Sequence, residues 1–436
     1  MTRRLPLLIR RATYSLRGGF LVRPLAIALI LGMAGAMFSW IEEMFPGLSD
    51  WVPRTIFPSH DDPQVAQVIL SGIAASIMTV VSIVFAILLM TLTLASMQFS
   101  PRIIVSFSKD RVTQWTLGIF LGTFCYCTAA LPAARTYPHP FAPVATTLGA
   151  MVLALMCVGW LLFFIHHISH AISVNYIVDR IAAETEIVID ELMPWPRRAN
   201  RMDSRDHTES VAWEASVLST VSGYIRVIDT ARLIDLAKSH RVKIKVLRRV
   251  GHFVPAGTPL LMVSREERIP EDGGAQFRGA FDLGPSRTLQ QDVEFGILQI
   301  VDIALKAISP AVNDPSTAIT CIDQLSRILI RVASREMPES ILYDPPGVAR
   351  LTIPWVSFDH LVESAFEQIR HYAVSDAVVS LRLLRALGDI AGTTADPSFR
   401  QILHDLGMRI VAGCDSKLSA AELKHLQRRF QCINGA

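Results

Sequence analysis

The stretch VAQVILSGIAASIMTVVSIVFAILLMTLTLASMQ, residues 65–98, contains no Asp, Glu, Lys or Arg. As one helix rising 1.5 Å per residue it would be about 50 Å long, whereas the hydrocarbon core of a bilayer is about 30 Å thick. An uncharged stretch of this length is typical of a membrane helix. We therefore predict a membrane-spanning helix that tilts, or that projects beyond the bilayer on one side.

Three more uncharged stretches lie near it, at residues 24–41, 115–134 and 136–165. Charge is concentrated outside residues 24–165, although 51% of the whole chain is hydrophobic. This contrast indicates a membrane part followed by a water-soluble part. The predicted fold class is a membrane α-helical domain of four transmembrane helices, followed by an α+β cytoplasmic domain: a small β-barrel or sandwich module plus a helical bundle.

Changes in composition along the chain predict the domain boundaries. We expect a transmembrane domain at 1–192, with spans at about 24–44, 65–98, 112–133 and 142–168 and a continuous helical extension of the last span into the cytoplasm. A polar linker at 193–210, a β-rich module at 211–285 and a helical domain at 286–436 should follow.

The charges beside the spans predict the orientation. Residues 1–23 carry six Arg and no acid, the loop at 42–64 is acidic, and the loop at 99–114 is basic. By the positive-inside rule the N-terminus is cytoplasmic, and four crossings bring the chain back, so the C-terminus should be cytoplasmic too. A cleaved signal peptide is the alternative for the first stretch, but its uncharged core is long for one. The net charge of +3 is too small to indicate nucleic-acid binding.

Small and hydroxylated residues recur along the second span at helical spacing. Intervals of three, four or seven place them on one helix face, a set we call the small-residue stripe: Ala75, Thr79, Ser82, Ala86 and Thr93, continued by Ser100. Such a face either packs against other helices, with its hydroxyls bonded to carbonyls four residues earlier, or lines a pore. Both interpretations stay open, and the stripe supplies the pore-lining candidates.

The spans show two further patterns. Apart from histidine we expect the spans to contain no ionisable acid or base, which argues against proton relays and voltage sensing. Pairs of small residues four apart, Gly118 with Gly122 and Gly32 with Ala36, predict close helix packing.

Three histidines stand where the fourth span should reach the membrane surface, in FIHHISH. On a helix His166 and His170 lie one turn apart on one face, a geometry that can bind a transition metal. The alternative is that they anchor the helix end at the interface. No HExxH glutamate accompanies them, so metalloprotease chemistry is not indicated.

The block at 211–264 changes to a β period, with Gly223, Gly251 and Gly257 as turn signals and a short helix that Asp229 should cap. The phrase VGHFVPAGTPLLMV resembles the strand, turn and strand of a biotinyl/lipoyl-type barrel-sandwich module. The modified-lysine hairpin of carrier domains is missing, so the resemblance implies a β scaffold and no cofactor.

Two helices joined by SPAVNDPST form the most distinctive soluble stretch. Pro310 ends the first helix, Asp314 should be the N-cap of the second, and Pro315 its first residue. The first helix carries a polar stripe at Asp292, Gln299, Asp302 and Lys306. The stripe is either solvated, or part of a small-ligand site in which Asp302, Asn313, Asp314 and Thr317 converge on a cation or an anion.

Residues 357–432 show apolar positions at helical spacing in four segments and predict a helical bundle. The six cysteines include no CxxC pattern, so we expect them to be packing residues rather than zinc ligands.

Four phrases resemble a bacterial family of predicted membrane proteins, domain of unknown function 2254. They are LASMQFSPRIIVSFSKDRVTQWTLGIFLGTFCY, FIHHISHAI, DIALKAISPAVNDPSTA and FDHLVESAFEQIRHYAVSDAVVSLRLLRALGDIA, in this order over nearly the whole chain. The resemblance implies an inner-membrane protein with several N-terminal spans and a cytoplasmic C-terminal domain, without an assigned activity. It marks Gln98, Pro101, Arg102, Gln114, Gly118, Gly122, His166, His167, Ser309, Pro310, Asn313, Asp314 and Pro315 as motif positions.

No nucleophile elbow, phosphate-binding loop or equivalent constellation indicates an enzyme. The sequence favours a homo-oligomeric channel or passive transporter for ions or small solutes, gated by its cytoplasmic domain. The alternative is a membrane-anchored sensor or scaffold whose cytoplasmic domain binds a ligand or protein. Expected partners are the lipid bilayer, further copies of the chain, and a small ion or ligand at the cytoplasmic domain.

Overall fold

The computed structural model describes residues 22–45, 47, 62–98, 110–137, 140–171, 173–195, 212–268, 273–344 and 347–431. The chain divides into two compact units, Met1–Ser173 and Val174–Ala436. Of the motif positions, Pro101 and Arg102 lie outside the described residues, as do Ser100 of the stripe and all the N-terminal arginines except Arg23.

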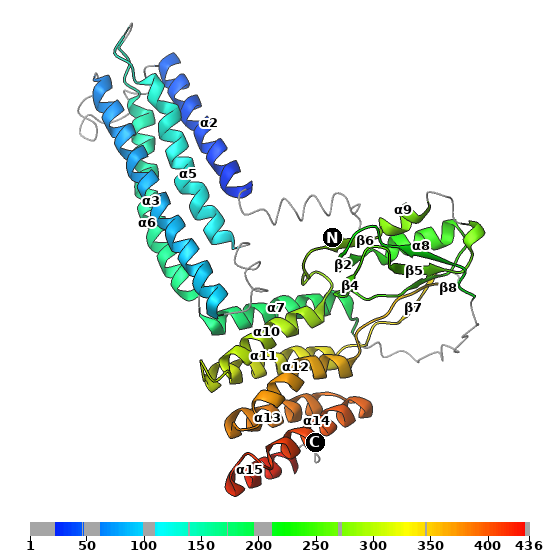
Figure 1. Cartoon of the computed structure of the whole chain (residues 1–436). Helices are drawn as coiled ribbons and strands as arrows, with labels where there is room; N and C mark the ends of the chain where they lie inside the picture. Colours follow the sequence, from blue (N-terminus) through cyan, green and yellow to red (C-terminus); the bar gives the residue numbers. More distant parts are fainter. Residues whose placement is uncertain are drawn as a thin grey trace. The chain divides into compact units, whose positions relative to one another are not determined.

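The first unit is a bundle of four long helices (Figure 1). They are α2 (Val22–Met44), α3 (Pro63–Gln98), α5 (Arg111–Ala130, followed by the 3₁₀ turn Leu131–Ala133) and α6 (Val144–Ala171). All four are long and apolar enough to cross a membrane. Four apolar N-terminal helices were predicted, and this part of the fold is confirmed.

Helix α5 is the centre of this bundle. Half of its apolar window is buried, against 22% or less in the other three helices. Gly118 lies against Ile27 of α2, and Gly122 against Leu31, so the predicted close packing at these glycines is confirmed. On α2 the closest approach is at Gly35, where a Cβ would come within 2.5 Å of the Tyr126 carbonyl oxygen. Ala36 is exposed, so the expected Gly32–Ala36 pair is replaced by Gly32 and Gly35.

The predicted helical continuation of the fourth span is interrupted. Helix α6 ends at Ala171, and α7 (Val174–Leu192) begins a separate, amphipathic helix that belongs to the second unit. The apolar side of α7 is buried against α10 and α11. Its polar side forms ion pairs with α11: Arg327 with Asp179 (2.8 Å) and Glu186 (2.6 Å). Packing against α10 and α11 therefore fixes α7 within the second unit.

The second unit contains two sheets around one apolar core. The first sheet has the order β1-β5-β3-β8-β7 and the second β4-β2-β6. The strands are β1 (Ala215–Leu218), β2 (Gly223–Ile228), β3 (Ile244–Val246), β4 (Phe253–Val254), β5 (Pro259–Val263), β6 (Phe281–Gly284), β7 (Ile341–Asp344) and β8 (Val348–Thr352). The sheets do not form a closed barrel.

Short helices complete this β module. They are α8 (Thr230–Ser239), the 3₁₀ turn Glu266–Arg268 and α9 (Gly273–Arg278). The Asp229 side chain accepts a hydrogen bond from the Arg232 amide, so the predicted cap of α8 is confirmed. Leu233 of α8 and Phe277 of α9 are fully buried in the core between the sheets.

The hairpin β7–β8 lies within residues 286–436, where a helical domain was expected. Strand β8 pairs in parallel with β3, with Ile244 opposite Leu351. Leu351 and Ile353 are buried in the core of the β module. The module therefore includes β7 and β8, which lie well beyond the segment at 211–264 in which strands were expected.

The remaining helices pack on one another in sequence (Figure 1). They are α10 (Val293–Ala307), α11 (Pro315–Ala333), α12 (Phe358–Tyr372), α13 (Ala377–Thr393), α14 (Pro397–Cys414) and α15 (Ala420–Gln431). The last four match the four helical segments predicted over 357–432. The fold class is thus confirmed at the level of apolar helices followed by a mixed region of sheets and helices.

Candidate functional site

The small-residue stripe lies on the outside of its own bundle. Ala75, Thr79, Ser82, Ala86 and Thr93 are all exposed, while the opposite side of α3 buries Leu70, Ala74 and Val84. The hydroxyls of Thr79, Ser82 and Thr93 donate to carbonyl oxygens four residues earlier, at 3.1, 3.0 and 2.8 Å. The stripe therefore does not line a path inside one copy of the bundle, and its pore-lining role stays a prediction that requires further copies.

Several buried polar side chains of the bundle lie on α5. Gln114, Thr116 and Thr123 are fully buried. Arg23 donates to Gln114 (3.2 Å), Trp160 donates to Thr116 (2.9 Å), and Thr123 lies 3.3 Å from the Cys157 sulfur. The seven-residue spacing of Thr116 and Thr123 was a signal for this face of α5. The polar face was predicted on α3 instead, because the stripe there is longer.

One carboxylate is buried at the end of α2. Glu42, only 2% exposed, accepts hydrogen bonds from the amides of Ala145 (2.7 Å) and Thr146 (2.9 Å) and from the Thr146 hydroxyl (2.7 Å). The prediction that the spans hold no acid was wrong, because α2 continues through Glu42. Its position at the start of α6 matches the preference of helix N-termini for negative charge.

Two of the three histidines at the end of α6 are neighbours. The rings of His166 and His170 are exposed, with centroids 4.4 Å apart. His170 Nδ1 lies 3.0 Å from the His166 carbonyl oxygen. His167 points elsewhere: its Nε2 lies 3.2 Å from Asp110, the N-cap of α5. Among the described residues, no three His, Cys, Asp or Glu side chains come together to hold a metal ion.

The loop between α10 and α11 has the predicted capping geometry. Asp314 accepts from the Thr317 amide (3.1 Å) and hydroxyl (2.6 Å), and Pro315 begins α11. The Thr317 hydroxyl, with the neighbouring amides, lowers the pKa of Asp314. Asn313 is exposed and adopts a positive φ of 50°, and Asp302 is half-buried on α10. Both Asp314 oxygens thus act in capping, and convergence of these residues on a ligand stays a prediction.

The predicted polar stripe of α10 is not a solvated face at its start. Asp292 is 4% exposed and caps α10 through the Phe295 amide (3.0 Å). Gln299 is 3% exposed. Asp292 also forms an ion pair with Arg287, whose Nε and Nη2 donate hydrogen bonds to the two carboxylate oxygens at 2.8 Å each. Burial with a paired guanidinium explains why a charged residue can sit there.

Asp292 belongs to a larger group of charges, which we call the Glu294 cluster: Arg249, Arg287, Asp292, Glu294 and His360. Both Nη atoms of Arg249 donate hydrogen bonds to the Glu294 carboxylate, at 3.0 and 3.2 Å, and Arg287 Nη2 donates a third to Glu294 at 2.8 Å. His360 Nε2 from α12 lies 2.5 Å from Glu294. The cluster joins the β module to α10 and α12.

Burial alone would raise the pKa of Glu294, but the hydrogen bonds and charges of Arg249 and Arg287 outweigh it and lower this pKa to about 2. Gly251 lies against the same cluster. Its φ of +88° favours glycine, and a Cβ there would meet an Asp292 oxygen at 2.5 Å. The sequence did not indicate this cluster, because its members are up to 111 residues apart.

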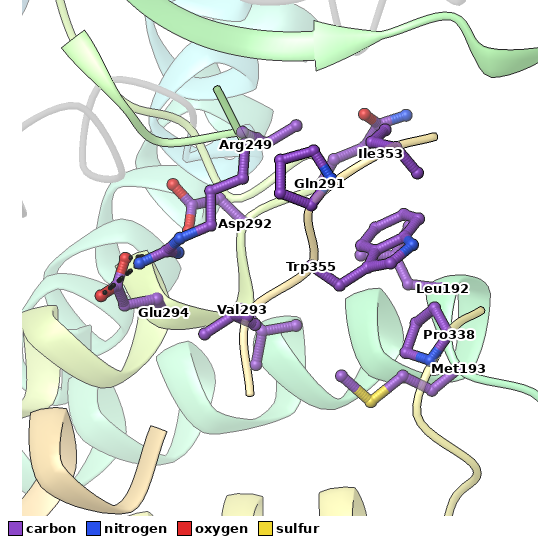
Figure 2. Close-up of a pocket in the computed structure, with 13 residues that line it drawn as sticks. Leu192, Met193, Arg249, Gln291, Asp292, Val293, Glu294, Pro338, Ile353 and Trp355 are labelled. Carbon is purple, nitrogen blue, oxygen red and sulfur yellow. Dashed lines mark hydrogen bonds and ion pairs between the residues drawn. The ribbon is translucent and has the colours of Figure 1, made fainter. Parts of the chain in front are cut away.

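A small pocket, open to solvent and with a cavity volume of about 30 Å³, lies beside the Glu294 cluster (Figure 2). Arg249, Asp292, Glu294 and Gln291 form its polar part. The rest is mostly apolar, formed by Leu192, Met193, Val250, Val293, Pro338, Ile353, Pro354, Trp355 and Val356. An apolar pocket with a few polar groups at one end is typical of small-molecule sites.

Comparison with known proteins agrees with this architecture. The profile of a family described as "Predicted membrane protein (DUF2254)" matches residues 17–389. Uncharacterized proteins of Mycobacterium bovis and Mycobacterium tuberculosis are 32% identical to the chain over 392 residues, covering 88% of this chain and 74% of theirs. No solved structure matches the chain significantly.

Proposed function

We propose, from the premise that this chain belongs to the DUF2254 family of predicted membrane proteins, that it forms a homo-oligomeric channel or passive transporter for ions or small solutes. In this proposal it is a non-enzymatic, multi-pass protein of a bacterial inner membrane. Both termini are cytoplasmic, and the second unit gates the path.

The observation that carries the proposal is the exposed small-residue stripe of α3. Small residues on a membrane helix are typical of surfaces where another helix approaches closely, because they let two backbones come together. Gly72, one turn before Ala75, has open space where its Cβ would be: no atom lies within 4 Å apart from its chain neighbours and the backbone of its own helix. The stripe thus has the composition of a helix interface while lying outside its own bundle.

The interior of one bundle offers little room for a path. At its centre Phe120 is 1% exposed, and the α2 and α5 backbones touch through Gly35. The polar groups of α5 lie within hydrogen-bonding distance of Arg23, Trp160 and Cys157. A hydrated path would therefore run between copies, with the hydroxyls of α3 turning from their own carbonyls toward water.

Cross-linking tests the arrangement. Cysteine variants Ala75→Cys and Ser82→Cys should join copies through a short thiol-reactive linker in lipid nanodiscs. Leu155→Cys on α6, 72% exposed, is the control and should not. The unsubstituted protein measures the background from native cysteines.

KCl efflux from proteoliposomes should fall when Ser82→Cys is modified. A monomer in nanodiscs would refute the channel, as would proteoliposomes whose KCl efflux equals that of liposomes without protein.

A second candidate function is favoured by the pocket beside the Glu294 cluster: a membrane-anchored sensor or scaffold that binds a ligand in its soluble unit. Charged groups buried next to a pocket are often functional. A ligand from a metabolite screen should raise the unfolding temperature of the wild type but not of Trp355→Ala. Trp213→Ala, outside the pocket, should respond as the wild type does. An equal response of all three proteins excludes this pocket.

A further inference from the structure

We propose that His166 and His170 form a binding site for a divalent transition-metal ion at the C-terminal end of α6. The two side chains are four residues apart on one helix, so they project from the same face. Their rings are exposed, and the centroids lie 4.4 Å apart. A metal ion from solution can therefore reach both imidazoles at once.

The tautomer of His170 leaves the outer nitrogen ready to bind. Its Nδ1 lies 3.0 Å from the backbone oxygen of His166. A carbonyl oxygen only accepts hydrogen bonds, so Nδ1 carries the proton and, in the neutral ring, Nε2 keeps its lone pair. Metal-binding histidines commonly donate their second ring N–H to a carbonyl or carboxylate, which orients the ring and makes the ligating nitrogen more basic.

The neighbouring histidine, His167, contacts other residues. His167 faces Asp110 at 3.2 Å, and its ring stacks on Phe163, so it points away from the pair. No third His, Cys, Asp or Glu joins His166 and His170 within the part of the chain that is described. The site therefore provides two imidazoles, and water completes the coordination sphere.

This ligand set defines the class of metal. Imidazole suits Cu²⁺, Ni²⁺ and Zn²⁺, with Cu²⁺ bound most tightly, whereas Mg²⁺ and Ca²⁺ prefer oxygen ligands. A metal bridging positions four apart would hold the last turn of α6 in helical form. The chain leaves α6 at the end of this turn and starts α7 at Val174.

Cu²⁺ and Zn²⁺ titrations of the full-length protein, purified without a histidine tag, test the site. We expect about one ion per chain, with a Cu²⁺ electron paramagnetic resonance spectrum that shows two nitrogen donors. Loss of second-shell partners alone weakens metal binding 10- to 100-fold, so His166→Ala and His170→Ala should weaken it by at least about tenfold. His425→Ala, which removes an exposed histidine elsewhere, should leave it unchanged.

Equal affinity in the wild type, His166→Ala and His170→Ala would overturn the proposal. The spectrum of the wild type gives an independent test that needs no variant: one nitrogen donor, or oxygen donors alone, would also refute a two-histidine site.

Discussion

Replacement of Glu42 tests how α2 is attached to α6. The carboxylate accepts three hydrogen bonds from Ala145 and Thr146 at the first turn of α6, and it is 2% exposed. Glu42→Gln keeps the shape of the side chain but replaces one acceptor oxygen by an NH₂ group. Glu42→Ala removes all three bonds and leaves two backbone amides without this partner.

The magnitude follows from these bonds. Hydrogen bonds to a charged group contribute about 1.5–3 kcal/mol each, but contributions within one group do not add fully. Glu42→Gln loses at least one of them, together with the negative charge at a helix N-terminus, so we expect about 2–3 kcal/mol lower unfolding free energy. Glu42→Ala should cost about 3–5 kcal/mol, because buried donors are left unpaired.

Glu43→Gln is the matched control. Glu43 pairs with Arg135, but both side chains are about 40% exposed, 39% and 41%. Exposed ion pairs of this kind contribute at most about 1 kcal/mol. The measurement is the midpoint of denaturant-induced unfolding in detergent, with helix content followed by circular dichroism. The attachment is refuted if Glu42→Ala unfolds within about 0.5 kcal/mol of the wild type, or if Glu43→Gln costs as much as Glu42→Gln.

Three further predictions concern stability. The Glu294 pKa of about 2 lies below its ordinary 4.5, so the ionised carboxylate stabilises the fold above about pH 4.5. This contribution, about 3 kcal/mol, is lost as the pH falls toward 2. Glu294→Gln should lack this loss in acid unfolding followed by circular dichroism, and an acid profile equal to that of the wild type would contradict the prediction. Gly35→Ala should lower stability by about 1–3 kcal/mol, because the added methyl group meets Tyr126. Gly72→Ala, with open space around it, should be neutral or raise stability by up to about 1 kcal/mol. Thermal unfolding of both variants checks this, and equal midpoints would refute the close packing at Gly35. Asp314→Ala removes the cap of α11 and should cost about 0.5–2 kcal/mol in denaturant unfolding, with Asp314→Asn less affected; no difference between Ala and wild type would exclude the cap.

Local sequence signals predicted the elements well, because their causes lie within a few residues. Uncharged length predicted the four apolar helices, and Asp229 and Asp314 were identified as N-caps from their position before a helical period. The glycines of α5 predicted close packing, because a missing side chain has the same effect whichever helix approaches.

Features that depend on distant residues could not be predicted in this way. Periodicity places Thr79 and Ser82 on one face of a helix but does not say whether that face is inside the bundle. Glu294 and His360 are 66 residues apart, and their contact depends on how α12 packs on α10. Glu42 lies within the predicted first span, 24–44, but its partners Ala145 and Thr146 are more than a hundred residues away, so the sequence did not indicate its role.

The parallel pairing of β3 with β8 has a consequence for biosynthesis. Strand β3 leaves the ribosome roughly a hundred residues before β8, which at 5–20 residues per second is a delay of roughly 5 to 20 s. During this interval one edge of β3 has no native neighbour, and an open strand edge can pair with other chains. Nascent chains that stop before residue 348 should therefore depend on chaperones and aggregate more readily than chains that extend past residue 352.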